Sequence, residues 1–243
     1  MSVATELAKL NTNIKNAYDE ISTKGGTIPQ NKNTDNLATA INSIPAGGGG
    51  ADDYYLTNNT YQQATKMIKK IPDITTSTTT LNSFASYYDE LVEVGNITAT
   101  NCTNLYYAFS EDKNLERVGT FNVGNITTCG YMFRGCKKLI SAPSLNTQYC
   151  TDFTAMFFYN FVLKDVPVYN FSSATSFTDM FKYCYDLTDQ SLDNILQSCI
   201  TATSFTGTKK LRSALSIYSG ISDARIQACP HYQDFLNAGW TIS

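Results

Sequence analysis

A phenylalanine recurs with a 24-residue period through the middle of this chain, at Phe109, Phe133, Phe157 and Phe181. A threonine stands at the sixth position before each phenylalanine and a leucine at the sixth position after it, and an asparagine follows each of the first three, at Asn122, Asn146 and Asn170. Chance does not hold four residue types in register over roughly 90 residues, so we interpret this region as a stack of repeated units. Stacks of this kind present a surface more often than an active site.

The positions around each phenylalanine predict the backbone of the repeat. Residues at −4, −1, 0 and +3 are mostly apolar, as in Cys129, Met132, Phe133 and Cys136. This spacing is typical of one face of a helix, and the threonine stands where an N-cap hydroxyl would. The leucine begins a short extended piece, and a polar loop then holds the asparagine. The predicted fold class is therefore an α/β solenoid in which each repeat contributes a capped helical turn and a short strand.

Both ends of such a stack need caps, because an open end exposes apolar surface. We place the repeats at 91–188. A degenerate repeat with Ala85 at the phenylalanine position makes 53–90 the N-terminal cap. Residues 189–243 form the C-terminal cap. Its opening segment, 189–199, predicts an amphipathic helix with Leu192, Ile195, Leu196 and Cys199 on one face.

The start of the chain predicts a small helical module at 1–45, followed by a glycine-rich linker at 46–52. Apolar residues alternate in steps of four and three, which is a heptad seam: Val3, Leu7, Leu10, Ile14, Ala17 and Ile21. A helix of roughly 20 residues is marginal alone, so this seam is a candidate for self-association or attachment. The alternative is a hairpin with a second helix at 34–43, and both interpretations stay open.

Two stretches resemble known families. Residues 121–157, with Met, Phe, Cys and Leu in register, resemble the BspA-like leucine-rich repeats, and the resemblance covers roughly 78–190; Ala108, Asp112 and Asn160 depart from the pattern. It implies a leucine-rich-repeat-like solenoid used for adhesion or assembly, without catalysis. Residues 7–45 resemble a module at the start of virion structural proteins of tailed phages of Gram-positive hosts. That resemblance implies a fibre or decoration protein of tail, baseplate or head, and makes a trimer the first expectation for a homo-oligomer.

Composition argues against several other classes of function. The net charge is −3 and no dense stripe of Lys and Arg occurs, since the three Lys-Lys pairs are isolated, so we expect no nucleic-acid partner. No run of roughly 18 apolar residues occurs, so we expect no membrane insertion. The cysteine count is odd, no C-x-x-C is present, and His231 is the single histidine. We therefore expect no disulfide framework, metal, cofactor or catalytic triad, and no enzymatic activity.

The opening residues lack the basic and apolar regions of a secretory signal, and the final residues lack a cell-wall anchor pattern. A bacterial adhesin would need one or both. We therefore expect a virion protein, assembled in the host cytoplasm and bound to other virion proteins through its N-terminal module. A bacterial cell-surface adhesin is the alternative, and an export signal upstream of Met1 would favour it.

Several aromatic residues fall outside the core register and are candidates for a ligand surface. They are Tyr106, Tyr107, Tyr131, Phe158, Tyr159, Phe161, Tyr183 and Tyr185. Rigid amphipathic rings among Asn, Thr and Ser suit contacts with a host cell-surface glycan or protein. The alternative is that these rings fill a second face of the stack or a subunit interface.

Overall fold

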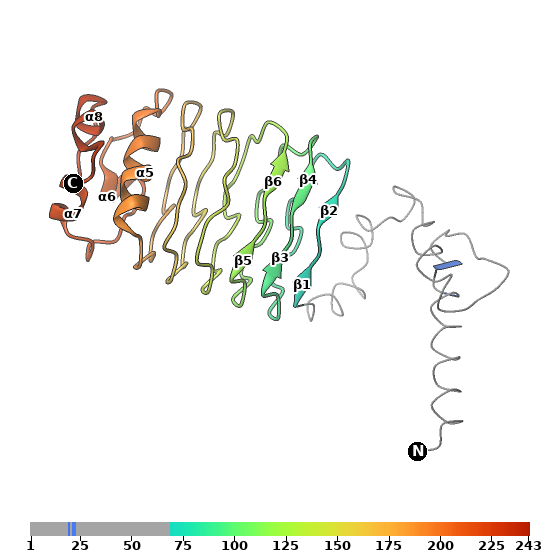
Figure 1. The fold of residues 1–243 in the computed structure, drawn as a ribbon. Helices are drawn as coiled ribbons and strands as arrows, with labels where there is room; N and C mark the ends of the chain where they lie inside the picture. The colour runs from blue at the N-terminus through green and yellow to red at the C-terminus, as the bar shows by residue number, and fades with distance from the viewer. Residues whose placement is uncertain (1–18, 20, 23–68) are drawn as a thin grey trace, which may run out of the picture. The chain divides into compact units, whose positions relative to one another are not determined.

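The chain divides into two compact units, Met1–Gln62 and Gln63–Ser243. A computed structural model describes residues 19, 21–22 and 69–243 (Figure 1). Most of the predicted heptad seam, the expected second helix at 34–43 and the linker at 46–52 lie outside the described residues. Of the seam residues, Ile21 alone is described; it is helical and buried.

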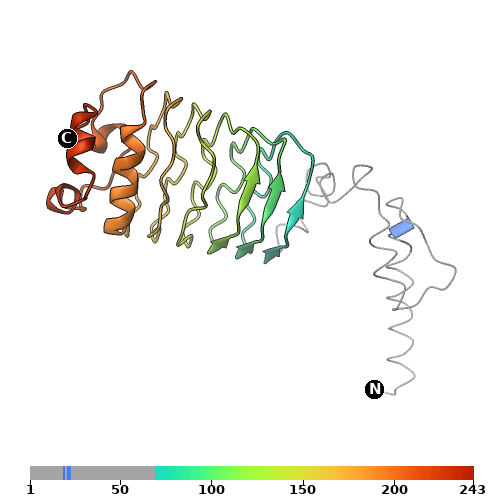
Figure 2. The ribbon, with the colours of Figure 1, turned by 45° about the horizontal axis from the view of Figure 1, so that its top comes forward.

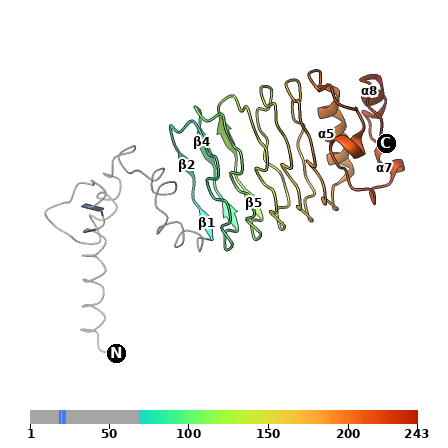
Figure 3. The ribbon, with the colours of Figure 1, turned by 180° about the vertical axis from the view of Figure 1, so that it is seen from behind.

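Two short parallel sheets begin the described part of the second unit. One sheet has the order β1 (Lys70–Ile71), β3 (Glu93–Val94), β5 (Arg117–Val118), and the other has the order β2 (Ile74–Thr75), β4 (Ile97–Ala99), β6 (Phe121–Val123). Neighbouring strands pair parallel, and the strands lie side by side in every view (Figures 1 and 3). Because each strand pairs with its counterpart in the next repeat, the sheets run across the repeats.

The pairing keeps the period of the sequence beyond the named strands. Isolated parallel bridges join equivalent positions of successive repeats, through Thr80, Asn104, Thr128, Asp152 and Ser176. Thr75 of β2 pairs with Thr98 of β4, whereas Thr80 pairs with Asn104, so the offset between partners is one residue smaller for the strands than for the bridge. The first described repeat is therefore one residue shorter than the others, and the missing residue lies between Thr75 and Thr80.

The segments around the phenylalanines, which we predicted to be helical, are not helices. Tyr107 and Glu111 have φ angles of 57° and 66°, and equivalent left-handed residues recur at both positions in all five repeats. Along the segment, the backbone N–H groups donate in turn to the next repeat and to a residue of the same turn. The N–H of Phe109 donates to the carbonyl of Met132 in the next repeat (2.8 Å), while that of Ala108 donates locally to Leu105 (3.1 Å). A residue with positive φ interrupts a right-handed helix, so each segment is a pair of tight turns.

The predicted α/β, leucine-rich-repeat-like solenoid is therefore wrong as a fold class. Over residues 69–188 the chain forms short parallel strands and turns, and all the helices of the second unit's described part follow Thr188. The helical spacing misleads because two successive tight turns bring the same positions inward. Cys129, Met132, Phe133 and Cys136 are all fully buried without belonging to a helix.

The repeated threonine has a different role from the predicted N-cap. The hydroxyl of Thr127 donates to the carbonyl of Thr103, and that of Thr151 donates to the carbonyl of Thr127 (3.1 and 3.2 Å). The residue after the threonine closes the turn instead. In one repeat this residue is Asn104, whose Oδ1 accepts from the N–H of Tyr106 at 2.9 Å. The threonines thus tie neighbouring repeats together, while the position after them closes the turn.

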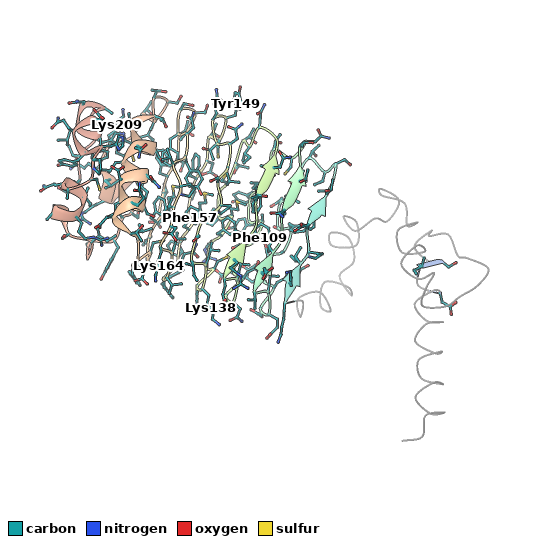
Figure 4. All side chains as sticks on the ribbon, viewed as in Figure 1. Phe109, Lys138, Tyr149, Phe157, Lys164 and Lys209 are labelled. Atoms are coloured by element: carbon teal, nitrogen blue, oxygen red, sulfur yellow. The ribbon has the colours of Figure 1, made fainter. Side chains whose placement is uncertain are left out.

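The repeated phenylalanines form the centre of the core, as predicted. All four are fully buried, and their rings stack along the chain with centroid distances of 5.4, 6.0 and 5.5 Å. Figure 4 labels Phe109 and Phe157 in the interior of the stack, with Tyr149 at one edge and Lys138 at the opposite edge. Truncating one ring would remove contacts to both neighbours.

Four helices end the chain on the side of the stack opposite β1: α5 (Asp189–Ile200), α6 (Leu211–Ala214), α7 (Asp223–Gln227) and α8 (Tyr232–Asn237) (Figure 2). Thr188 caps α5 by accepting from the N–H of Ser191 at 3.2 Å. The predicted buried face of this helix is confirmed for all four of its apolar residues. Trp240 is fully buried and stacks on Phe205 at 5.7 Å, which closes the apolar end of the repeats.

Candidate functional site: an aromatic face on the repeats

The aromatic residues that avoid the core register contact one another on the surface. Tyr107 and Tyr131 stack with ring centroids 4.6 Å apart and an interplanar angle of 2°. Tyr159 and Tyr183 stack in the same way at 4.7 Å and 6°. Each pair joins equivalent positions of adjacent repeats, so the period of the sequence itself builds the ring ladder.

The remaining rings extend these two stacks. Tyr106 meets Tyr131 edge-on at 5.6 Å, and Phe158 meets Tyr183 edge-on at 5.6 Å. Phe161 and Tyr185 stack at 5.7 Å, and Tyr185 also contacts Tyr218 at 4.7 Å. We call the whole set the aromatic face: Tyr106, Tyr107, Tyr131, Phe158, Tyr159, Phe161, Tyr183, Tyr185 and Tyr218. All of its members keep part of their surface exposed.

One member, Tyr218, is outside the predicted set. Phe161 belongs to that set, and it stands one full period before Tyr185, so the two share a register position. Tyr218 belongs to the C-terminal helical region, where the period no longer applies, and nothing in the sequence places it beside Tyr185. It is 41% exposed and adds a ring at the end of the ladder.

The backbone under the aromatic face is strained. Tyr107, Tyr131, Tyr159 and Tyr183 have φ angles of 57° to 66°, in the left-handed region. This conformation suits glycine and is uncommon for a bulky side chain. Gly135 occupies one of the equivalent positions with φ 76°. Tyrosine is therefore not the residue that the turn itself favours, and local strain of this kind clusters at functional sites.

Charged groups lie among the rings. Arg134 forms an ion pair with Glu111 and stands 5.6 Å from the ring centroid of Phe158. Lys182 pairs with Asp179 at 3.2 Å and also lies 5.6 Å from Phe158. Lys137 lies 5.8 Å from the centroid of Phe161. Most of the charge is thus balanced locally, and the cations hold to the rings by cation–π attraction.

Tyrosine hydroxyls supply hydrogen-bonding groups at the tips of the aromatic face. Burial raises the pKa of Tyr107, with the neighbouring Tyr106 as the next contribution. Burial likewise raises the pKa of Tyr185. The hydroxyls of Tyr107 and Tyr185 therefore stay protonated, and each can both donate and accept a hydrogen bond. The face combines apolar ring area with polar tips, a combination suited to binding another surface.

The single histidine is paired inside the C-terminal cap. His231 Nδ1 lies 2.8 Å from Asp193 Oδ2, and the backbone N–H of His231 donates to Asp193 Oδ1 at 2.9 Å.

Among the described residues, no group of three or more His, Cys, Asp or Glu side chains converges as metal ligands would. In the same part of the chain, no helix has the length and apolar character needed to cross a bilayer.

All seven cysteines are free and buried. Burial raises the pKa of the Cys136 and Cys184 thiols above the ordinary value, and that of Cys229 to about 11. Cys136 and Cys184 donate to the carbonyls of Phe109 and Phe157 at 3.0 and 3.1 Å. A protonated buried thiol is a poor nucleophile, so these residues act as small core groups with one hydrogen bond.

Part of the chain matches a protein family. Residues 100–218 match the family described as "Mycoplasma protein of unknown function, DUF285". No curated protein and no experimentally determined structure matches the chain. The matching family is related to the BspA-like repeats, so the region that carries the aromatic face is similar to a repeat family of that kind.

Proposed function

We propose that this chain is a non-enzymatic structural protein of a tailed-phage virion, whose aromatic face adheres to the surface of the host cell. The observation that carries the proposal is the set of tyrosines in left-handed conformation. A stack selected only for stability would place glycine at these positions, as it does at Gly135. Tyrosine there adds ring area to the surface at a cost in backbone strain, which is expected of a binding surface.

The composition of the face supports adhesion. Tyrosine and arginine are enriched at the centres of protein-binding surfaces, and tyrosine gives rigid contact area at low entropic cost. Residues 1–45 attach the protein to other virion proteins or to further copies of itself, with a trimer as the first choice. These roles rest on the resemblance of residues 7–45 to phage virion proteins.

Binding of the fluorescently labelled full chain to a panel of Gram-positive bacteria tests adhesion. Tyr131→Ser and Tyr159→Gly place at each site a residue that already occurs at the equivalent position, as Ser83 and Gly135 show. Both variants should keep the thermal melt nearly unchanged and reduce cell binding. Tyr149→Ser is the matched control, because Tyr149 is 48% exposed and Ser173 stands at its equivalent position. Equal binding by all four proteins would refute adhesion through this face.

Immuno-electron microscopy of phage particles produced from the genome that carries this gene tests the virion assignment. Antibody raised against the protein should label a defined place on tail, baseplate or head. Mass measurement in solution of the full chain and of a chain beginning at Ala51 tests self-association. If both are monomers, self-association through the heptad seam is wrong, while attachment to another virion protein still stands.

One observation favours a second candidate, a bacterial cell-surface adhesin or virulence factor. The matching family is described as mycoplasmal, which points to a bacterial source for the repeats. Fractionation of the producing bacterium separates the two candidates. Protein found on the surface of growing cells would support the adhesin, and protein found only in released phage particles would support the virion protein.

A further inference from the structure

The C-terminal cap contains a groove that none of the repeats contributes to. It has a volume of about 520 Å³, within the usual range of small-molecule sites. It is lined by Gln197 and Ile200 from α5, and by His231, Asp234, Asn237 and Ala238 from α8 and its flanks. Neither the proposed adhesion face nor the repeat register accounts for these polar groups.

The imidazole of His231 is held in a fixed orientation in this groove. Its Nδ1 and its backbone N–H both bond the carboxylate of Asp193, at 2.8 and 2.9 Å. Asp193 is 4% exposed and also accepts from Nε2 of Gln197 at 3.0 Å. Asp193 is a positioning residue, because it anchors two lining side chains from behind. With Nδ1 committed to the carboxylate, Nε2 is the ring nitrogen that remains for a ligand.

The other polar groups of the groove are mainly acceptors. The carboxylate of Asp234 and the amide of Asn237 are on exposed residues of α8. Asn237 Oδ1 accepts from Gln233 Nε2 at 3.1 Å, which directs the Nδ2 donor of Asn237 away from that bond. A carboxylate, a glutamine carbonyl and an imidazole nitrogen that carries no proton accept hydrogen bonds, while one amide donates. A ligand that matches this set must itself supply several donors.

The lining residues restrict the charge of that ligand. No lysine or arginine is among them, and Asp234 would repel a phosphate or a carboxylate. Lys209 is nearby, and its Nζ donates to the carbonyl of Ala238 at 3.0 Å. A divalent cation would find two side-chain ligands of the usual kind, His231 and Asp234, and no group of three exists among the described residues. An uncharged molecule with many hydroxyl groups satisfies the acceptors without either difficulty.

We propose that this groove binds one uncharged sugar residue, with Asp234, Asn237 and the Nε2 of His231 bonding its hydroxyls. Ile200 and Ala238 supply apolar contact for the C–H face of the ring. The inference deepens the proposed adhesion function, and rests on it only for the source of the sugar, a glycan of the host surface. The two helices that contribute lining residues, α5 and α8, lie at the end of the stack opposite β1 (Figure 1).

The single histidine of the chain gives a reporter inside the groove. In proton NMR of the full chain, one set of imidazole signals comes from His231 and needs no labelling. Glucose, galactose and N-acetylglucosamine are titrated separately, with glucuronate and inorganic phosphate as charged comparators. We expect at least one neutral sugar to shift the imidazole signals in a saturable way, and glucuronate to shift them far less than glucose.

Variants decide whether the sugar is bound by these residues. Asp234→Asn should weaken binding on the order of tenfold, the effect of losing one charge-assisted hydrogen bond, and Asn237→Ala should weaken it less. Gln227→Ala, on the exposed surface of α7, is the control and should bind normally. All three keep His231, and far-ultraviolet circular dichroism checks that they fold.

Other outcomes overturn the proposal. Sugar binding seen by calorimetry with no movement of the imidazole signals would place the sugar elsewhere, the aromatic face included. A saturable shift with Zn²⁺ and none with any sugar would make the groove a metal site. No response to any probe would also refute the sugar site, while loss of cell binding in the aromatic-face variants would still support adhesion.

Discussion

Replacing Asn160 by cysteine should stabilise the protein, although it changes a fully buried residue. Asn160 occupies the position held by Cys136 and Cys184 in the neighbouring repeats. Those two thiols each donate to a carbonyl of the preceding repeat, at 3.0 and 3.1 Å. In Asn160, by contrast, both Nδ2 and Oδ1 are buried without a hydrogen-bond partner. The substitution removes that defect and lets a thiol reach the carbonyl of Phe133.

The expected gain follows from the cost of the defect. A buried polar group without a partner costs about 1–3 kcal/mol. Cysteine is close in volume to asparagine, so little packing should be lost, and we expect Asn160→Cys to gain about 1–3 kcal/mol. For a domain of this size that gain corresponds to a rise in melting temperature of roughly 2–12 °C. Chemical denaturation by urea, followed by circular dichroism, measures the free energy of unfolding directly.

A reciprocal variant provides the control. Cys136→Asn creates the same defect one repeat earlier and should destabilise by a similar amount. Asn160→Ala removes the unpartnered amide but adds no thiol bond and leaves a small cavity, so its stability should fall between wild type and Asn160→Cys. If Asn160→Cys and Cys136→Asn both leave the free energy of unfolding unchanged, the amide of Asn160 is satisfied in solution and the reasoning is wrong.

Three further predictions follow from the core. Phe157→Ala should cost about 3–5 kcal/mol in the same denaturation assay, because its ring stacks on Phe133 and Phe181; a small loss would contradict the ring stack. Burial raises the pKa of the Asp112 carboxyl well above its ordinary value. Its contribution to the free energy of unfolding is therefore fully present below the unfolded pKa of about 3.9, and it is lost as pH rises through the folded pKa. Asp112→Asn should therefore flatten the decline in stability between acidic and neutral pH, and an unchanged slope would refute this. The seven thiols should react slowly with a chromogenic disulfide reagent at mildly alkaline pH in the native protein, and fast in denaturant, because all are buried and the pKa of Cys229 is about 11; rapid labelling of the folded protein would be inconsistent with that burial.

The period and the buried positions could be predicted from the sequence, because packing against similar neighbours imposes the same residue type at each equivalent site. The backbone between them could not. Glycine at both left-handed positions would have indicated tight turns, yet Gly135 is the only glycine among them, and tyrosine stands at several others. Without that indicator, the apolar spacing predicts a helix. The predicted capping residue, Thr103, stands one position before Asn104, the residue that closes the turn. The sequence does not distinguish the two, because threonine and asparagine are both good caps.

Part of the candidate site could likewise be predicted from the sequence, and part could not. The paired tyrosines could be predicted, because they avoid the core register and repeat with its period. Tyr218 and the groove beside His231 could not, because they arise where segments far apart in the chain meet. His231 binds Asp193, which belongs to a different helix far earlier in the chain, and no periodic pattern links the two. Most of the first unit, including most of the seam, lies outside the described residues, so its predicted roles stay predictions.

The shortened first repeat shows where this architecture tolerates a change in length. One residue is missing between Thr75 and Thr80, and parallel pairing continues on both sides of the gap. The two left-handed positions, by contrast, keep the same separation in every repeat. The corner equivalent to 75–80 can therefore accept insertions, such as a short epitope or a fluorophore tag, without shifting the rings. A label placed there would follow the protein while leaving the aromatic face and the groove untouched.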